Sequence, residues 1–202
     1  PHPIQPQYPE AAHRLLDGIT DILIELLVGQ YQAGADILQV FESNGDALGP
    51  ARFAEFALPY LAKIAREVRK RVPPVSRGGP GLIVFAKGAH YALEALAAET
   101  EYDVLGLDWG VDPAAAVRLV RDVAARTGKP VKALQGNLDP CELFGAADDI
   151  RAATTAMLAG FGDHPLIANL GHGMLPSHTP EALGTFFSTV QEVSTRAWAS
   201  RS

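Results

Sequence analysis

Five apolar runs of the sequence are each followed at once by polar side chains that could bind a ligand. In chain order these side chains are Ser43, Lys87, Asp108, the pair Asn137 and Asp139, and His172. Short apolar runs bounded by turn residues are typical of buried strands. If the strands are parallel, their downstream ends open onto one face, and in parallel barrels that face carries the active site. The pattern therefore predicts a functional rim built from separate loops.

The alternative interpretation of these residues is structural, because Ser, Asn and Asp also begin the turns that lead into helices. Asp139 is expected to cap the helix that follows it, and Asn137 to cap that helix or to fix the loop through nearby backbone amides. His172 is the strongest functional candidate. The glycines on either side of it, Gly171 and Gly173, let the backbone approach a ligand closely.

Lys87 allows two interpretations of its own. A lysine at a strand end can form a Schiff base if burial lowers its pKa. The favoured interpretation is an ion pair with Asp108 or with a neighbouring carboxylate at the same rim. Trp109, which follows Asp108, is interpreted as a packing residue and not as a surface on which a substrate stacks.

Cys141 is the only cysteine, so internal disulfides and multi-thiolate metal sites are ruled out. A single cysteine fits a reducing compartment, and the cytoplasm is the default expectation. A nearby helix start could lower the thiol pKa, but the thiol is predicted to be buried as a small hydrophobe. The sequence contains neither HExxH nor GxxxxGK[ST], so it has no recognisable zinc or phosphate-binding motif.

Composition and charge are those of an ordinary globular protein. Of the 202 residues, 48% are hydrophobic and 20% charged, which allows one domain. Seventeen basic against 23 acidic residues give a net charge of −6, which disfavours binding to nucleic acids or anionic membranes. The longest apolar run, Ile19–Gly29, contains two acidic residues and is shorter than the roughly 20 residues that span a bilayer.

Helical periodicity alternates with these strand-like runs. Strands are expected over residues 35–41, 81–88, 103–109, 131–139 and 165–173, and helices over 10–31, 53–68, 90–98, from 112, 146–160 and 180–198. The first helix is expected to bury a face containing Leu15, Ile19, Ile22, Leu26 and Leu27. Pro59 is expected to start a second helical piece within 53–68, because proline is tolerated in a first helical turn.

Strands alternating with helices predict an α/β fold with parallel pairing. An open dinucleotide-binding sheet would carry GxGxxG after its first strand, and that spacing is absent. A (β/α)8 TIM barrel takes about 250 residues, so five units in 202 residues predict an incomplete barrel. The first residue, Pro1, is not Met, and we expect residues 1–202 to be a single-domain portion of a longer chain that lacks its N-terminal strands.

Six motifs spread along the chain resemble the C-terminal part of the uroporphyrinogen decarboxylase family. They are LQVFES, FALPYL, IVFAKGAHYALE, LGLDW, LQGNLDPCELF and IANLGHGMLP, in the family's order and at similar spacings. The resemblance implies a distorted (β/α)8 barrel, a homodimer, and the removal of carbon dioxide from the four acetate arms of uroporphyrinogen to give coproporphyrinogen in haem biosynthesis. It also implies a lyase that needs no metal or organic cofactor.

The resemblance assigns substrate binding to three residues of this chain. Ser43 and His172 resemble positions that hydrogen-bond the carboxylate arms, and Phe41 resembles a residue that lines the macrocycle pocket. The family's catalytic aspartate and its substrate-binding arginines belong to the early half of the barrel, so the chain by itself is expected to be inactive. The sequence departs from the family at Asn44-Gly45-Asp46, where the family usually has His or Trp followed by Ala-Gly. Asp46 adds a negative charge near a polyanionic substrate.

Two other functions stay open at this point. The related cobalamin-dependent methyltransferases share the barrel but use a zinc site of His and Cys residues, which one cysteine fits poorly. A non-catalytic tetrapyrrole-binding remnant would keep the binding residues without turnover.

Overall fold

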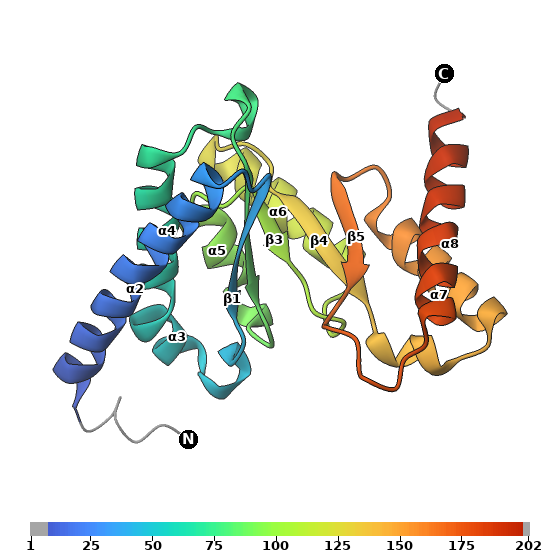
Figure 1. Ribbon diagram of the computed structural model, residues 1–202, viewed down its shortest axis with the longest axis horizontal. Coiled ribbons are helices and arrows are strands. Elements are labelled where there is room, and N and C mark those ends of the chain that lie inside the picture. The colour runs from blue at the N-terminus through green and yellow to red at the C-terminus, as the bar shows by residue number, and fades with distance from the viewer. Residues whose placement is uncertain (1–7, 200–202) are drawn as a thin grey trace. The chain divides into compact units, whose positions relative to one another are not determined.

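A computed structural model describes residues 8–199, in which strands and helices alternate (Figure 1). The strands are β1 (Ile37–Glu42), β2 (Gly81–Ala86), β3 (Val104–Gly106), β4 (Ala133–Leu138) and β5 (Leu166–Leu170). The α-helices are α2 (Pro9–Gln32), α3 (Pro50–Phe56), α4 (Leu58–Arg71), α5 (Leu93–Glu99), α6 (Pro113–Thr127), α7 (Ala147–Phe161) and α8 (Pro180–Ala199). Short 3-10 helices are η1 (Gly45–Ala47), η2 (Val75–Arg77), η3 (His90–Ala92) and η4 (Pro140–Phe144).

The strands follow one another in chain order, β1-β2-β3-β4-β5. The two pairs β1–β2 and β4–β5 are parallel, as the alternation of strands and helices predicts. The α/β fold is therefore confirmed. The strand predicted over residues 103–109 is shorter in the structure, because only Val104–Gly106 has strand geometry.

The chain divides into two compact units. The first contains the described residues up to Leu105 together with Val120–Lys132, and the second contains Gly106–Leu119 and the residues from Ala133 onward. The first unit thus holds β1, β2 and helices α2 to α5. The second holds β4, β5, α7 and α8.

In the first unit, β1 presents one face to the core and leaves the other uncovered. Leu38 and Val40 are buried and pair in register with the buried Leu82 and Val84 of β2. On the other face of β1, the side chains of Ile37 and Phe41 are exposed. The prediction of a largely buried strand is therefore wrong for one face of β1. Parallel sheets are normally covered on both faces, so this face is available to a ligand or to further chain.

Helix α2 lies beside α4 in the first unit (Figure 1). The face that it buries contains Ala12, Thr20, Ile24, Leu27 and Val28. Of the predicted core face only Leu27 is buried. The other four residues, Leu15, Ile19, Ile22 and Leu26, are 44 to 69% exposed, so that prediction is wrong. Helix α2 is apolar on two sides, and hydrophobic spacing alone does not say which side meets α4.

The segment between residues 50 and 71 forms two helices, as predicted from Pro59. Helix α3 ends at Phe56, α4 begins at Leu58, and Pro59 occupies the first turn of α4. Five apolar residues at helical spacing in this segment are buried: Phe53, Phe56, Leu61, Ile64 and Val68. Each such side chain contributes about 1.5–3 kcal/mol through burial.

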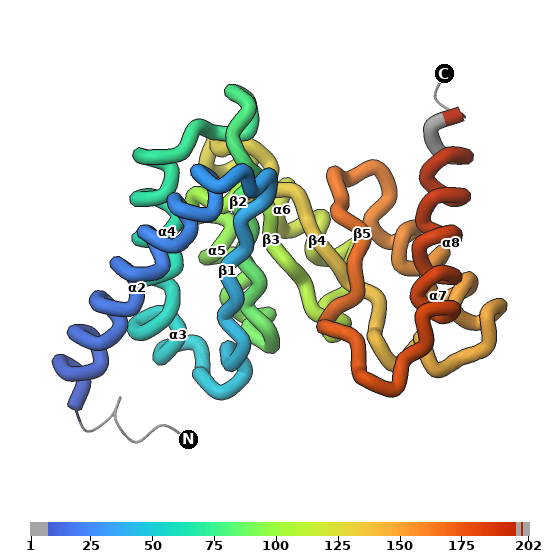
Figure 2. Tube along the Cα trace, in the orientation of Figure 1, coloured from blue at the N-terminus to red at the C-terminus, as the bar shows by residue number. Residues whose placement is uncertain are grey.

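In the second unit, α7 packs on β4 and α8 packs on α7 (Figure 2). Strand β4 is almost entirely buried, whereas β5 is half covered and exposes Ile167 and Asn169. None of the helices described between residues 8 and 199 is long and apolar enough to cross a membrane.

Candidate functional site

The first unit carries two of the predicted binding residues at the downstream end of β1. The Phe41 side chain is 63% exposed and meets the ring of Phe85 edge-on, with ring centroids 6.1 Å apart. Ser43 is exposed just beyond the strand, and its hydroxyl has no hydrogen-bond partner among residues 8–199. An aromatic wall and an available hydroxyl donor therefore lie two residues apart.

The loops that follow β1 and β2 are pressed together through glycines. A Cβ on Gly45 would lie 2.8 Å from both the Ala89 Cβ and the Lys87 carbonyl oxygen. A Cβ on Gly88, whose φ is +70°, would lie 2.4 Å from the Cβ of Asp46. The Asn44-Gly45-Asp46 turn therefore fits this contact only because residue 45 is glycine.

Lys87 forms an ion pair with a neighbouring carboxylate, as predicted. Its Nζ lies 3.5 Å from Oδ2 of Asp46. Asp108, the other partner considered for Lys87, belongs to the second unit. The negative charge of Asp46 is therefore partly offset by a lysine of the adjacent loop.

In the second unit, Asn137 has a role that the sequence did not reveal. Its side chain is 5% exposed, and its Nδ2 donates to the carbonyl oxygens of Asp108 at 2.9 Å and Val111 at 2.7 Å. Asn137 thus neither caps the next helix nor bonds to its own loop, and that prediction is wrong. It holds both ends of the Asp108–Val111 turn. Asp108 is buried in the same turn, where Oδ1 accepts from the Gly110 amide at 2.9 Å.

His172 lies exposed beyond β5, next to the indole of Trp109. The two rings meet edge-to-face, with centroids 6.0 Å apart and planes at 84°. The Nδ1 atom of His172 makes a long 3.4 Å contact with the Gly173 carbonyl oxygen. Trp109 is 45% exposed, so packing, the role predicted for it, involves only part of its side chain.

Gly171 brings the end of β5 against the Trp109 backbone. A Cβ at Gly171 would lie 2.3 Å from the Trp109 amide nitrogen, whereas a Cβ at Gly173 would meet nothing within 4 Å. Gly171 therefore permits a close approach, but the group approached is the Trp109 backbone of this chain. That the two glycines let a ligand approach stays a prediction.

Asp139 is a helix cap, but of the short η4, which was not predicted, and not of the expected helix over 146–160: its Oδ1 accepts from the Cys141 amide at 2.9 Å. Cys141 is exposed, so the prediction of a buried thiol is wrong. The Asp139 carboxylate is the main cause of a raised pKa for the Cys141 thiol, with smaller effects from burial and from Glu142. A thiol held in its protonated form is a poor nucleophile and a poor metal ligand. Among residues 8–199, no three His, Cys, Asp or Glu side chains gather as a metal site would require.

A network of charged groups lies at the starts of β2 and β3. Ser43, in contrast, follows the downstream end of β1. Asp103 accepts from the Leu82 amide at 2.8 Å and from Arg69, while Lys132 donates to the carbonyl oxygens of Thr100 and Tyr102. Burial lowers the pKa of Lys132, because the charged form loses solvation. These bonds satisfy backbone groups at the strand starts and indicate a role in stability.

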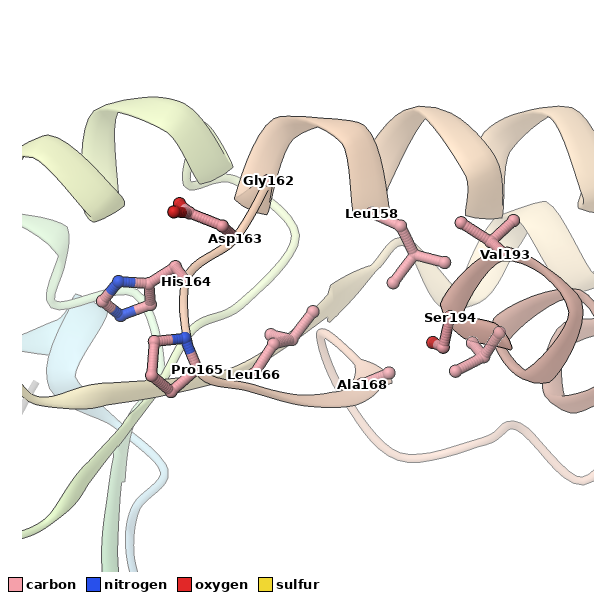
Figure 3. Close-up of a pocket in the computed structure, with 10 residues that line it drawn as sticks. Leu158, Gly162, Asp163, His164, Pro165, Leu166, Ala168, Val193 and Ser194 are labelled. Atoms are coloured by element: carbon pink, nitrogen blue, oxygen red, sulfur yellow. The ribbon is translucent and has the colours of Figure 1, made fainter. Parts of the chain in front are cut away.

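A cavity of about 480 Å³ lies in the second unit between β5 and the helices α7 and α8 (Figure 3). Leu166 and Ala168 of β5 face Leu158 of α7 and Val193 of α8 across it. The cavity adjoins the start of β5, away from His172 at the end of that strand, so it is separate from the predicted rim. The β5 residues that line it, Leu166 and Ala168, are half-buried and alternate with the exposed Ile167 and Asn169.

The structure places the predicted residues in two groups. Phe41, Ser43 and Lys87 belong to the first unit, whereas Asp108, Asn137, Asp139 and His172 belong to the second. All of them lie at or beyond the downstream ends of their strands. That Ser43 and His172 serve one common cleft stays a prediction.

Comparison with known proteins gives one consistent family. Residues 5–193 match the family model for uroporphyrinogen decarboxylase (URO-D). The uroporphyrinogen decarboxylase of Danio rerio is 48% identical over 184 residues, which cover 91% of this chain and 47% of the relative. That of Salinibacter ruber is 48% identical over 186 residues (92% and 49%), and that of Homo sapiens 45% identical over 186 residues (92% and 48%). The chain thus spans about half the length of the curated relatives that it matches.

Proposed function

Because the chain belongs to the uroporphyrinogen decarboxylase family, we propose that the protein decarboxylates uroporphyrinogen and that this chain binds the acidic arms of the substrate. The observation that carries the proposal is the agreement between the family match, which covers nearly the whole chain, and the exposure of the three predicted binding residues. Ser43, His172 and Phe41 all lie at downstream strand ends.

The substrate has four acetate arms, so its binding site must offer donors to carboxylate oxygens. The Ser43 hydroxyl and the His172 imidazole can both donate such hydrogen bonds. Both side chains are exposed, and neither is engaged in a strong hydrogen bond within residues 8–199. Phe41 adds an apolar surface suited to one face of a pyrrole ring. These groups bind and orient the substrate and are not proposed to transfer protons.

The chemical step needs groups of another kind. Loss of carbon dioxide from an acetate leaves an electron pair, and a pyrrole protonated at a ring carbon can accept it. Protonation of the ring carbon places a positive charge on the pyrrole until carbon dioxide leaves, and an aspartate near the pyrrole N–H groups is suited to stabilise that charge. We propose that this aspartate, and the arginines that pair with substrate carboxylates, come from the part of the family's length that the chain does not span. Residues 1–202 would then form the C-terminal portion of one barrel domain, with the N-terminal strands supplied by that other part.

The ion pair between Asp46 and Lys87 bears on whether this copy is functional. An unpaired Asp46 carboxylate near the cleft would repel a polyanion. Because Lys87 Nζ lies 3.5 Å from it, we propose that the departure from the family at residues 44–46 is compatible with substrate binding.

A chimaera tests the proposal. Residues 8–199 replace the matching half of the Danio rerio relative, and uroporphyrinogen turnover is compared with that of the 202-residue chain alone. We expect turnover in the chimaera and none in the isolated chain. Turnover by the isolated chain would refute the claim that essential groups lie elsewhere. A folded chimaera that binds the macrocycle without turnover would identify a non-catalytic binding protein instead.

His172→Ala in the active chimaera separates binding from chemistry. We expect KM to rise about tenfold with kcat changed less than about threefold, since a hydrogen bond to a charged group is worth roughly 1.5–3 kcal/mol when buried and less when exposed. Asn169→Ala, which removes an exposed side chain on the preceding strand, is the control and should leave both constants unchanged. An unchanged KM in His172→Ala would remove His172 from the site.

The family assignment also suggests a homodimer in the cytoplasm. We include both in the proposal, supported by the resemblance alone. Light scattering on the chimaera should give the mass of two chains, and a concentration-independent monomer would contradict it. Fractionation of cells that express the natural protein tests the compartment.

A further inference from the structure

Trp109 is a large aromatic side chain that is left 45% exposed at a strand end, next to an exposed His172. The edge-to-face contact between the two rings, with centroids 6.0 Å apart, is of the kind that stabilises aromatic pairs by about 0.5–1.5 kcal/mol. A contact of this size restricts the orientation of His172 but leaves a wide indole surface open. Trp109 therefore offers an exposed aromatic surface beside a predicted substrate-binding residue.

Trp109 belongs to the Asp108–Val111 turn, which Asn137 fixes by hydrogen bonds. Asn137 donates both amide hydrogens to this turn, to the carbonyl oxygens of Asp108 and Val111. The Val111 amide closes the turn by donating to the Asp108 carbonyl oxygen at 3.2 Å. Because the Asn137 amide is buried, water cannot readily replace these bonds, and the turn has little freedom.

Gly171, which directly follows β5, contacts the backbone of the same turn. The Gly171 amide donates to the Leu138 carbonyl oxygen at 2.7 Å, which ties this segment to the end of β4. Gly171 also packs against the Trp109 backbone so closely that no Cβ fits between them. His172, the next residue, therefore has a position set by the same contacts that place Trp109. The two rings form one preorganised surface.

We propose, on the basis of the proposed function, that Trp109 is a substrate-binding residue that contacts one pyrrole ring of the macrocycle while His172 donates to the acidic arm of that ring. A pyrrole ring can meet the indole edge-on or in an offset stack. The carboxylate carbon of its acetate arm is two bonds from the ring, so the arm is short enough for a ring that contacts Trp109 to present it to the adjacent imidazole, whose centroid lies 6.0 Å from that of the indole. Asn137 is a positioning residue that acts through the Asp108–Val111 turn.

The geometry of the pair is tested first in the 202-residue chain by NMR. The imidazole proton resonances of His172, assigned by their loss in His172→Gln, should shift in Trp109→Leu because the indole ring current is removed. Trp109→Phe should shift them less, since an aromatic edge contact is retained. Asn137→Ser should shift the same resonances through its effect on the turn. Phe187→Leu is the matched control, because Phe187 is also an aromatic side chain about half exposed in the second unit, but it lies on α8.

The binding role is tested with uroporphyrin, the stable oxidised form of the macrocycle, in the chimaera. We expect Trp109→Leu to weaken uroporphyrin binding about three- to tenfold, Trp109→Phe by less than about twofold, and Phe187→Leu not at all. Asn137→Ser should also weaken it, and circular dichroism is used to confirm that each variant is folded. Wild-type affinity in folded Trp109→Leu would overturn the proposal, as would the absence of uroporphyrin binding by the unmodified chimaera.

This binding assay separates the two proposals. A chimaera that binds uroporphyrin through Trp109 but does not turn over uroporphyrinogen would contradict the proposed decarboxylase function and leave the role of Trp109 intact. A chimaera with full turnover and no effect of Trp109→Leu on binding or KM would support the proposed decarboxylase function and contradict the role of Trp109.

Discussion

The two units hold their strand ends in different ways. In the first unit, the loops after β1 and β2 meet through Gly45 and Gly88 and an ion pair between Asp46 and Lys87 that is open to solvent. In the second, the turn after β3 is held by the buried amide of Asn137 and by the backbone of Gly171. Buried hydrogen bonds lose more when broken than exposed ion pairs do. His172 is therefore expected to be placed more rigidly than Ser43.

The largest effect is expected for Gly171→Ala. The new Cβ would lie 2.3 Å from the Trp109 amide nitrogen and 2.9 Å from the Asp108 carbonyl carbon, both of which are backbone atoms that cannot rotate away. We expect a loss of about 3 kcal/mol in the free energy of unfolding, measured by urea denaturation, because overpacking against backbone forces the strand ends apart.

Gly173→Ala is the matched control for this prediction. It adds the same methyl group on the other side of His172, where nothing lies within 4 Å, and should change stability by less than about 0.5 kcal/mol. Equal effects of the two substitutions would show that the end of β5 is not packed against Trp109.

The next largest effect is expected for Asn137→Ala. It removes the side-chain donor from the Val111 carbonyl oxygen and one of two donors from the Asp108 carbonyl oxygen, which still accepts from the Val111 amide at 3.2 Å. An unsatisfied buried group costs about 1–3 kcal/mol, so we expect a loss near 2 kcal/mol in the free energy of unfolding. Ser43→Ala in the first unit, which removes an exposed hydroxyl, should cost less than about 0.5 kcal/mol. Similar losses at the two positions would contradict the difference between the units.

Gly171 and Asn137 also show how far the sequence could predict the site. Gly171 and His172 are adjacent in the chain, so a glycine that permits close packing beside a candidate binding residue could be predicted from the sequence. The acceptors of Asn137 lie 29 and 26 residues earlier in the sequence, and no local pattern identifies partners at that separation. The contact between Trp109 and His172 is equally non-local. Residue types at strand ends were therefore predictable, whereas the bonds that join different strand ends were not.

The fold was predictable where spacing alone determines it. The alternation of strands and helices, their parallel pairing, and the break before Pro59 follow from local patterns. The buried face of α2 did not follow, because Ile22 and Ile24 lie on different apolar sides of that helix and only packing against α4 selects one. Cys141 was expected to be buried from its residue type, but its place in the exposed part of η4 decides otherwise.

A smaller effect in the second unit concerns the reactivity of Cys141. The negative charge of Asp139 raises the pKa of the thiol, so Asp139→Asn should lower that pKa and increase the thiolate fraction at pH 7.5. We expect alkylation by iodoacetamide to become about two- to fivefold faster, the gain being limited because a less basic thiolate is also less nucleophilic. The asparagine keeps an oxygen that can accept from the Cys141 amide, so the cap is retained. Since Cys141 is the only cysteine, the rate reports this site alone, and an unchanged or slower rate would show that Asp139 does not control it.

The smallest effect is expected for the Asp46–Lys87 pair in the first unit. The two side chains are 56% and 28% exposed, and exposed ion pairs contribute about 0–1 kcal/mol that salt screens further. A double-mutant cycle with Asp46→Asn and Lys87→Met should therefore give a coupling energy below about 1 kcal/mol that decreases between 0.05 and 0.5 M NaCl. A coupling above about 2 kcal/mol that resists salt would mean that the loops after β1 and β2 are held as firmly as the Asp108–Val111 turn, because only a pair shielded from solvent behaves in that way. Ser43 would then be as well positioned as His172, and the contrast between the two units would be lost.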